Sequence, residues 1–363
     1  MGKYLYISLL LISFSLASCQ RTKSNSPYSS SVITPSHPGE GKGRGAVGAF
    51  TPVKDQGHLQ ACWIYAYLAC METERIEQFD DSLNLSPLWL INALMHEQAE
   101  ACYLTKGKRK MSMRGIGPDA ERLLKEYGMV PYSFFHYSED LNSNMIERNI
   151  TLKVKQAVNV KKGLSALHND VSTALPRIPH NLEQGFYLYG MHYTPQMFGN
   201  SLLAGTTMRW LTSYTHHPFN EPFDIELPDN HRHNLVMNVP IDTLYRCVIT
   251  SLKHRHPVFW EGKMPTSMAA TMTATASQKT AMHRDFAATN KGNELQEARQ
   301  RAFERYETTD DHAMAIIGLA EDKQGNAVFI CKNSWGKEWG DHGFCCMKAE
   351  DFLINTVLVG VME

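Results

Sequence analysis

The sequence lacks several features that would assign a chain of this length to a class directly. Beyond the first 16 residues it has no apolar run approaching the roughly 18 residues that a membrane-spanning helix needs. Its 36 basic and 37 acidic residues nearly cancel and the basic ones are scattered, which excludes a nucleic-acid-binding footprint. Eight cysteines among 363 residues are too few for a disulfide-dense exported domain, and no internal repeat is evident. What remains is a globular chain too long for one compact core, which predicts two lobes.

The N-terminus has the pattern of an export signal. A charged start is followed by an apolar run from Leu5 to Leu16 and by the small residues Ala17 and Ser18 before Cys19. This order predicts a signal peptide over residues 1–19 rather than a membrane span. It resembles a bacterial lipobox, which implies a lipid anchor on Cys19 and an exported, membrane-anchored bacterial lipoprotein that faces the periplasm or the cell surface. The alternative is an ordinary signal peptide in which the cysteine is incidental.

The rest of the chain divides by composition. Residues 20–44 are rich in Ser, Pro, Gly and Lys and predict a disordered tether. Three helices are expected in the first half. The first covers 64–79, the second begins at Pro87 with Ser86 as its N-cap, and the third ends at Gly128. The first half is therefore helical.

The second half is richer in strands. Strand-like segments are residues 232–240, 257–260, 313–319, 328–332, 343–348 and 356–362. An exposed helix is expected over 293–305, and a polar surface excursion over 264–288. The segment 137–230 mixes charged helix with loops. The prediction is an α+β chain, with a helical lobe at about 60–135, an insertion at 137–230, a β-rich lobe at 231–363 and a cleft between the lobes.

Four residues far apart in sequence carry the chemistry. Cys62 falls at the expected start of a helix, where backbone N–H groups and the helix dipole lower a thiol pKa. Gln56, six residues earlier, is placed to donate to an oxyanion beside the Cys62 backbone N–H. His312 precedes an apolar strand, and Asn333 can hold its second ring nitrogen. A thiol, an imidazole and an amide supplied in this way predict a cysteine hydrolase.

Each of these residues also has an ordinary structural interpretation. A lone cysteine at a helix start is usually structural, a histidine before a strand is usually packed, and an asparagine usually marks a turn. The run Asn333-Ser334-Trp335-Gly336 after a strand is more specific, because Trp335 can cover the histidine–asparagine hydrogen bond and Gly336 permits a tight loop.

These motifs resemble those of the papain-like cysteine peptidases, in particular the bleomycin hydrolase and aminopeptidase C subgroup. The resemblance covers most of residues 45–363 and is weak over 137–230. The matching residues are Gly45-Ala46-Val47, 51–57, Cys62-Trp63, Leu85-Ser86, Gly115 before Ala120, His312-Ala313-Met314 and Asn333-Ser334-Trp335-Gly336, with 257–260 and 340–344 pointing to the subgroup.

The resemblance implies the roles of the site residues. It implies a papain-like two-lobe fold, with a helical lobe packed against a β-barrel-like antiparallel lobe. Cys62 would be the nucleophile, His312 the general base and acid, Asn333 its orienter and Gln56 an oxyanion donor. It also implies that Trp335 shields the histidine and that the Gly115 backbone pairs with a peptide or protein substrate.

The chain departs from the family pattern at several positions. Leu59 stands where a disulfide cysteine is usual, so that disulfide cannot form. Gln60 replaces a glycine and is expected to narrow or polarise the S1 side of the cleft. Arg114 replaces the first of a glycine pair, which favours acidic or small groups in the non-primed subsites. We also expect no inhibitory propeptide, and no C-terminal arm after the last strand of the kind that restricts the subgroup's aminopeptidases.

Three pairs of histidines lie close in sequence: His216 and His217, His231 and His233, His254 and His256. They lack the i, i+4 helical spacing or the paired cysteines of a zinc site. We therefore predict solvated loop histidines, with no metal and no cofactor.

The leading hypothesis is a cysteine peptidase that acts through a thioester. Two alternatives stay open, a binding protein on a catalytically retired papain fold and an acyl transferase that uses the same thiolate. The natural substrate, the choice between endo- and aminopeptidase cleavage, and the oligomeric state are not determined by the sequence.

Overall fold

The computed structural model describes residues 46–265, 290–321 and 326–363, apart from 48, 82, 138 and 139. All of these belong to one compact unit, residues 32–363. The expected signal peptide with Cys19, the tether over 20–44 and most of the 264–288 excursion lie outside the described residues. Among the described helices, none has the length and hydropathy needed to cross a membrane.

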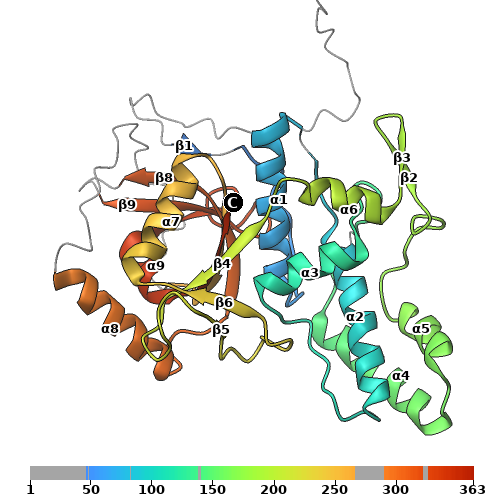
Figure 1. The fold of residues 1–363 in the computed structure, drawn as a ribbon. Coiled ribbons are helices and arrows are strands. Elements are labelled where there is room, and N and C mark those ends of the chain that lie inside the picture. The colour runs from blue at the N-terminus through green and yellow to red at the C-terminus, as the bar shows by residue number, and fades with distance from the viewer. Residues whose placement is uncertain (1–45, 48, 82, 138–139, 266–289, 322–325) are drawn as a thin grey trace, which may run out of the picture. The chain divides into compact units, whose positions relative to one another are not determined.

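One large sheet forms the β-rich lobe (Figure 1). Its order is β10-β9-β8-β7-β11-β4-β6-β5, and β1 pairs with β8. The strands are β1 (Ala46–Val47), β4 (Met208–Thr212), β5 (Pro222–Asp224), β6 (Leu235–Asn238), β7 (Val258–Gly262), β8 (His312–Glu321), β9 (Ala327–Lys332), β10 (Phe344–Lys348) and β11 (Thr356–Met362). A separate hairpin joins β2 (Phe186–Leu188) and β3 (Met191–Tyr193).

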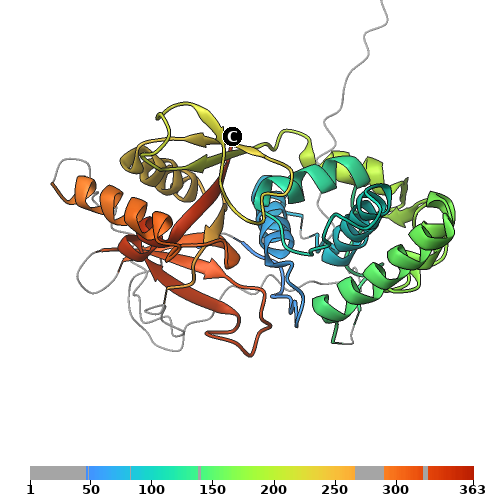
Figure 2. The ribbon, with the colours of Figure 1, turned by 90° about the horizontal axis from the view of Figure 1, so that it is seen from below.

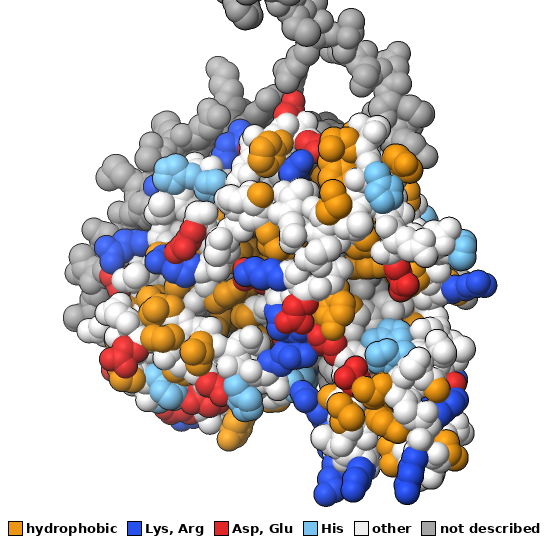
Figure 3. Space-filling view, turned by 45° about the vertical axis from the view of Figure 1, so that its right-hand side comes forward, with side chains coloured by type: hydrophobic (Ala, Val, Ile, Leu, Met, Phe, Trp, Pro, Cys, Tyr) orange, Lys and Arg blue, Asp and Glu red, His pale blue; other side chains and the backbone are white. Residues whose placement is uncertain are grey.

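Helices cover this sheet and form the second lobe. The helices are α1 (Cys62–Phe79), α2 (Pro87–Leu104), α3 (Gly117–Tyr127), α4 (Ser143–Val160), α5 (Leu164–Ser172), α6 (Pro195–Leu203), α7 (Ile241–Lys253), α8 (Asn290–Glu304) and α9 (Ala349–Asn355). Figures 1 and 2 both show α4 and α5 farthest from the sheet. The described surface seen in Figure 3 intersperses acidic and basic side chains, in keeping with the near-zero net charge.

Helix α1 joins the two lobes because it is apolar around most of its circumference. It packs against α2 and α3 on one side and against β7 and β8 on the other. Along β8, Ala313 and Ala315 pack in the core that contains α1, whereas Met314 and Ile316 pack in the core that contains α7. Coverage of both faces explains why β8 is apolar at nearly every position.

The α+β class is confirmed, and the structure corrects five details. The sheet is not closed into a barrel, and β4 and β6 pair in parallel. Strands β4 and β5 come from the 137–230 segment, so the boundary expected at 230 is too late for the sheet. Ser86 is the N-cap residue of α2, but its hydroxyl donates to the Phe135 carbonyl and makes no capping bond. The helix expected to be exposed is α8, yet its Arg299 is fully buried against Tyr214, Ser213 and Leu353.

Candidate active site

Cys62 is the first residue of α1, as the sequence predicts, so its thiol lies among the unpaired N–H groups of the helix start. It lines a cleft of about 160 Å³. The site residues predicted from the sequence that line the same cleft are Gln56, Gln60, Arg114, Gly115, His312 and Trp335. Asn333 is not part of the cleft lining, but its side chain contacts His312, which is. Four segments far apart in sequence, 56–62, 114–115, 312 and 333–335, therefore meet at one cleft.

The His312 ring is held by Asn333, which follows the end of the neighbouring strand β9. Nε2 of His312 lies 2.8 Å from Oδ1 of Asn333. The same Oδ1 accepts the Ser334 N–H at 2.8 Å, so the amide oxygen must face both groups. Nε2 therefore carries the proton, and Nδ1 is left as a hydrogen-bond acceptor. This orientation leaves Asn333 Nδ2 buried with no partner in the described part of the chain.

Trp335 covers the histidine. Its ring centroid lies 4.5 Å from that of His312, and Trp339 packs edge-on against it at 5.0 Å. Both indoles come from the loop that Asn333 opens, in which Gly336 and Gly340 have positive φ. The rings keep water from the His312–Asn333 hydrogen bond, which strengthens that bond.

Gln56 is fixed to the same loop. Its backbone N–H donates to the Ser334 carbonyl at 2.8 Å, and its Oε1 accepts from the Ser334 hydroxyl at 2.6 Å. Its Nε2 donates one hydrogen to the Leu59 carbonyl at 2.6 Å. The second Nε2 hydrogen has no acceptor among the described residues. Gln60 also lines the cleft, and its backbone N–H is tied to Ser143 Oγ at 2.7 Å.

Gly115 approaches Trp63 closely because it has no Cβ. A Cβ at this position would lie 2.7 Å from the indole carbon Cζ2 of Trp63. The indole cannot retreat, since Trp63 is 1% exposed and its Nε1 donates to the Met113 carbonyl at 3.1 Å.

We therefore expect Gly115→Ala to destabilise the fold by about 1–3 kcal/mol, because the added methyl overpacks a filled site. Urea unfolding followed by tryptophan fluorescence measures this loss. An unchanged unfolding midpoint would mean that the 114–115 segment shifts to accommodate the added methyl group at no cost in stability.

Burial disfavours the charged forms of Cys62 and His312 and shifts both pKa values accordingly. It raises the pKa of the Cys62 thiol to about 12, with the Glu261 carboxylate as the second cause, while hydrogen bonds from the Ala313 and Trp63 backbone oppose the shift. It lowers the pKa of His312 to about 4, with the Asn333 bond opposing. The backbone N–H of Trp63 at the helix start lowers the thiol pKa, as the sequence predicts, but burial outweighs it and the pKa is raised overall. Taken alone, each group is therefore neutral at pH 7.

Three carboxylates of the cleft were missed by sequence reasoning. Asp229, Glu261 and Asp310 line it beside Cys62. Asp310 stands two residues before His312, and Glu261 directly follows the predicted strand 257–260. These positions next to predicted site elements were the signals in the sequence that could have identified Asp310 and Glu261 as cleft residues. The pairing of β7 with β8, which sets Glu261 opposite Ala313, was needed to interpret them.

A buried charge network holds the pieces of the site together. Glu72 of α1 accepts from Lys54 Nζ at 2.6 Å, from the Leu85 N–H at 2.7 Å and from the Thr51 hydroxyl. Lys332 Nζ donates to the same hydroxyl at 2.9 Å and lies 3.9 Å from Glu72. Burial lowers the pKa of Lys332 to about 7. Lys54 precedes Gln56, and Lys332 precedes Asn333, so the helix that carries Cys62 anchors both partner segments.

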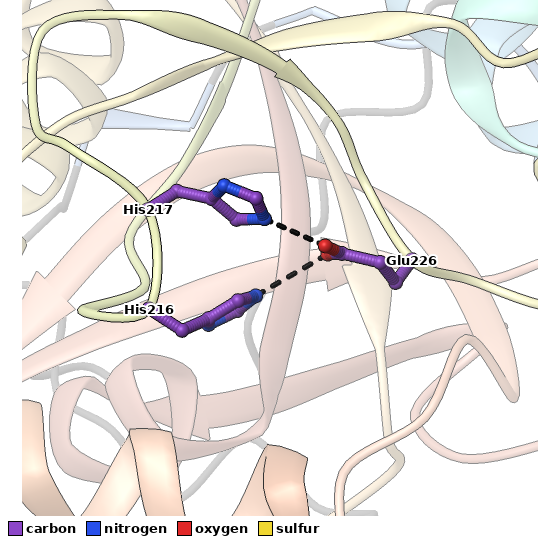
Figure 4. Close-up of side chains that lie close together, drawn as sticks. All are labelled: His216, His217 and Glu226. Atoms are coloured by element: carbon purple, nitrogen blue, oxygen red, sulfur yellow. Dashed lines mark hydrogen bonds and ion pairs between the residues drawn. The ribbon is translucent and has the colours of Figure 1, made fainter.

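A second group of ionisable side chains lies outside the cleft lining (Figure 4). Nε2 of His216 and of His217 lie 3.2 and 2.6 Å from the two oxygens of Glu226. Gln300 Nε2 donates to His216 Nδ1 at 2.9 Å, and Gln300 Oε1 accepts the Thr215 N–H at 2.7 Å. This fixes the His216 proton on Nε2, so that nitrogen has no lone pair for a metal. Hydrogen bonding accounts for the cluster, and we assign it no metal.

The other histidine pairs also contact carboxylates. His233 Nδ1 lies 2.6 Å from Asp224, His256 Nδ1 lies 2.9 Å from Glu74, and His231 Nε2 lies 4.0 Å from Asp229.

Comparisons with known proteins point to one family. Residues 209–359 match the model of the Peptidase C1-like family. Thiol protease SEN102 of Hemerocallis sp. is 45% identical over 38 residues, 10% of this chain and 11% of that protein. Fruit bromelain of Ananas comosus is 42% identical over 40 residues, 11% of each. The chain thus covers about a tenth of the length of these curated relatives.

Among solved structures, PepW of Lactobacillus rhamnosis HN001 superposes with a TM-score of 0.61 at 17% identity, covering 91% of this chain and 82% of that one. At this identity the likeness shows the fold. Two lobes with a cysteine, a histidine and an asparagine brought to one cleft define a papain-like α+β protein. The chain therefore has a papain-like fold, and its residues 209–359 match the Peptidase C1-like family.

Proposed function

We propose that the protein is a cysteine peptidase that hydrolyses peptide bonds through Cys62, His312 and Asn333. The observation that carries the proposal is the fixed His312 tautomer. Asn333 holds the protonated Nε2 at 2.8 Å, and His312 and Cys62 line one cleft. A nucleophilic cysteine is activated by a base that is held in a fixed orientation in the same site.

The groups of the site have distinct tasks in the reaction. Nδ1 of His312 takes the thiol proton as Sγ of Cys62 attacks the substrate carbonyl, because neither group is charged alone at neutral pH. The oxyanion that forms receives the Cys62 N–H and the second Nε2 hydrogen of Gln56. His312 then protonates the leaving amine, which leaves a thioester. Water, deprotonated by His312, cleaves the thioester and restores the thiol.

Asn333 acts through His312, so its loss is expected to change both the rate and the pH profile. Asn333→Ala should lower kcat/KM by roughly 10- to 100-fold, because the imidazole loses its fixed direction. The wild-type rate should rise with pH through about 4, the pKa of His312. Since the Asn333 bond raises that pKa, the acid limb of the variant should move to lower pH.

The measurement is a kcat/KM profile from pH 3 to 8 on an uncharged fluorogenic peptide, with the range chosen to bracket the pKa of about 4. A merely structural role for Asn333 would lower the rate and leave the acid limb where it is. That outcome would contradict the orienting role.

Hydrolysis has to be separated from acyl transfer, because both pass through the same thioester. Products of an N-acylated peptide ester are analysed by mass spectrometry with and without an added amine. Free acid as the main product in both samples supports the peptidase. An amide that dominates when the amine is present would make the protein an acyl transferase. If there is neither turnover nor labelling of Cys62, the hypothesis of a binding protein on a catalytically retired papain fold is favoured.

The lipid anchor and the exported location are part of the proposal. They rest on the order of residues before Cys19, as described above. Labelling of cells with a fatty-acid probe tests them, with Cys19→Ser as the comparison. An unlabelled wild-type protein would remove the anchor from the proposal.

A further inference from the structure

One wall of the cleft is acidic. Asp229, Glu261 and Asp310 come from three separate parts of the chain and line the cavity that contains Cys62. They are 6%, 2% and 6% exposed, so all three carboxylates are withdrawn from bulk water. We call them the acidic subsite. The exposed Asp311 also lines the cleft.

Among the described residues, Arg114 is the permanently charged cation that contacts this subsite, and His231 Nε2 lies 4.0 Å from Asp229. Arg114 places Nε 2.6 Å from Asp229, with a longer approach of 3.9 Å to Oδ1 of Asp310. Oδ2 of Asp310 is buried and has no partner among the described residues. Glu261 accepts the Gly117 N–H at 3.1 Å and forms no ion pair within the described part of the chain. One guanidinium thus faces three carboxylates.

Burying unbalanced carboxylates is costly, and their proton affinities reflect it. Burial and then the neighbouring Asp310 raise the pKa of Glu261 well above its usual range. Burial and then Asp229 raise the pKa of Asp310 to about 6. A cation brought into the subsite would relieve this repulsion and supply the missing partners.

The subsite adjoins the reacting atoms. In the β7–β8 pair, Glu261 lies directly opposite Ala313 and Gly262 opposite His312. Side chains of directly opposite residues lie on the same face of a sheet, and Ala313 faces α1, the helix that carries Cys62. A group bound at Glu261 therefore lies on the face of the sheet that packs against the helix of Cys62, and the Glu261 carboxylate is close enough to raise the pKa of that thiol.

We propose that the acidic subsite binds a cationic group, an ammonium or a guanidinium, on the acyl portion of a peptide substrate. The proposal rests on the peptidase function above and names its substrate class. It reverses the preference for acidic groups expected from Arg114 in the sequence, because that guanidinium is engaged by Asp229 and Asp310. The cation can come from an arginine or lysine side chain or from a free peptide N-terminus.

The test uses the full-length protein and matched fluorogenic dipeptides. The first pair is N-acetylated and differs only in arginine against citrulline, its neutral isostere, placed in turn at each acyl position. The second pair carries leucine and differs only in a free against an acetylated N-terminus. We expect kcat/KM to favour the cationic member of at least one pair by about tenfold or more. The pair that responds identifies the source of the cation.

Two variants assign the effect to the subsite. Glu261→Gln and Asp310→Asn should each reduce the ratio of cationic to neutral kcat/KM toward one. The ratio is measured within one enzyme, so a general loss of activity cancels. Glu297→Gln, an exposed glutamate on α8, serves as the control and should keep the wild-type ratio. The wild-type comparison needs no variant and holds even if one variant fails to fold.

The outcomes separate this inference from the proposed function. Cleavage of neutral and cationic members at equal rates would overturn the subsite and leave the peptidase intact. A cation preference that survives both substitutions would overturn its assignment to these carboxylates. No cleavage of any peptide, together with no labelling of Cys62 by a neutral peptidyl epoxide, would overturn the peptidase and the subsite with it.

Discussion

Replacement of Cys62 by alanine is expected to abolish peptide hydrolysis, with kcat/KM falling by at least about a thousandfold. The reason is that the proposed intermediate is a thioester, and Cys62 carries the single thiol among the described residues of the cleft. The thermal stability should change little, because Cys62 is only part-buried and forms no disulfide. Labelling by a peptidyl epoxide, counted by intact mass, should be stoichiometric in the wild type and absent in Cys62→Ala.

Cys247→Ala is the matched control. Cys247 is also a free, part-exposed thiol, but it lines a different surface pocket together with Arg209 and Thr250. This variant should keep both activity and labelling. Epoxide labelling that spreads over several cysteines, or that persists in Cys62→Ala, would show that the cleft does not activate its thiol. The retired binding protein would then be the better description.

Glu72→Ala should destabilise the protein by about 3–5 kcal/mol, the largest stability effect that we expect. Glu72 is fully buried, and its removal leaves Lys332 without its anion and the Leu85 N–H without its acceptor. The loss should also loosen the Gln56 and Asn333 segments, so epoxide labelling of the folded variant should slow. Urea unfolding at pH 7.5 measures the first effect, and the labelling rate measures the second.

A double variant tests whether the charges are coupled. Lys332→Met removes the cation that Glu72 would leave behind, so Glu72→Ala with Lys332→Met should cost less than the sum of the two single changes. Glu297→Ala, at an exposed ion pair with Arg301, is the control and should change stability by less than about 0.5 kcal/mol. Additive losses in the double variant would mean that the network contributes packing alone.

Local chemistry explains which parts of the fold could be predicted. The start of α1 at Cys62, Pro87 as the first residue of α2 and the end of α3 before Gly128 follow from rules that act within a few residues. No such local rule locates β4, because its place depends on pairing with β11, which follows it by more than 140 residues. Helices α7 and α9 were missed as well, because each lies close to predicted strands.

The candidate site residues can be identified from local motifs, since Gln56, Cys62, His312 and Asn333 each stand in a recognisable one. Their charge states follow from the packing of the folded chain, because burial depends on what surrounds a group and no local motif encodes it. Burial makes Cys62 a thiol and His312 a neutral ring when each is taken alone. The pairing of β7 with β8 likewise brings Glu261 to the cleft and turns three unremarked carboxylates into an acidic subsite.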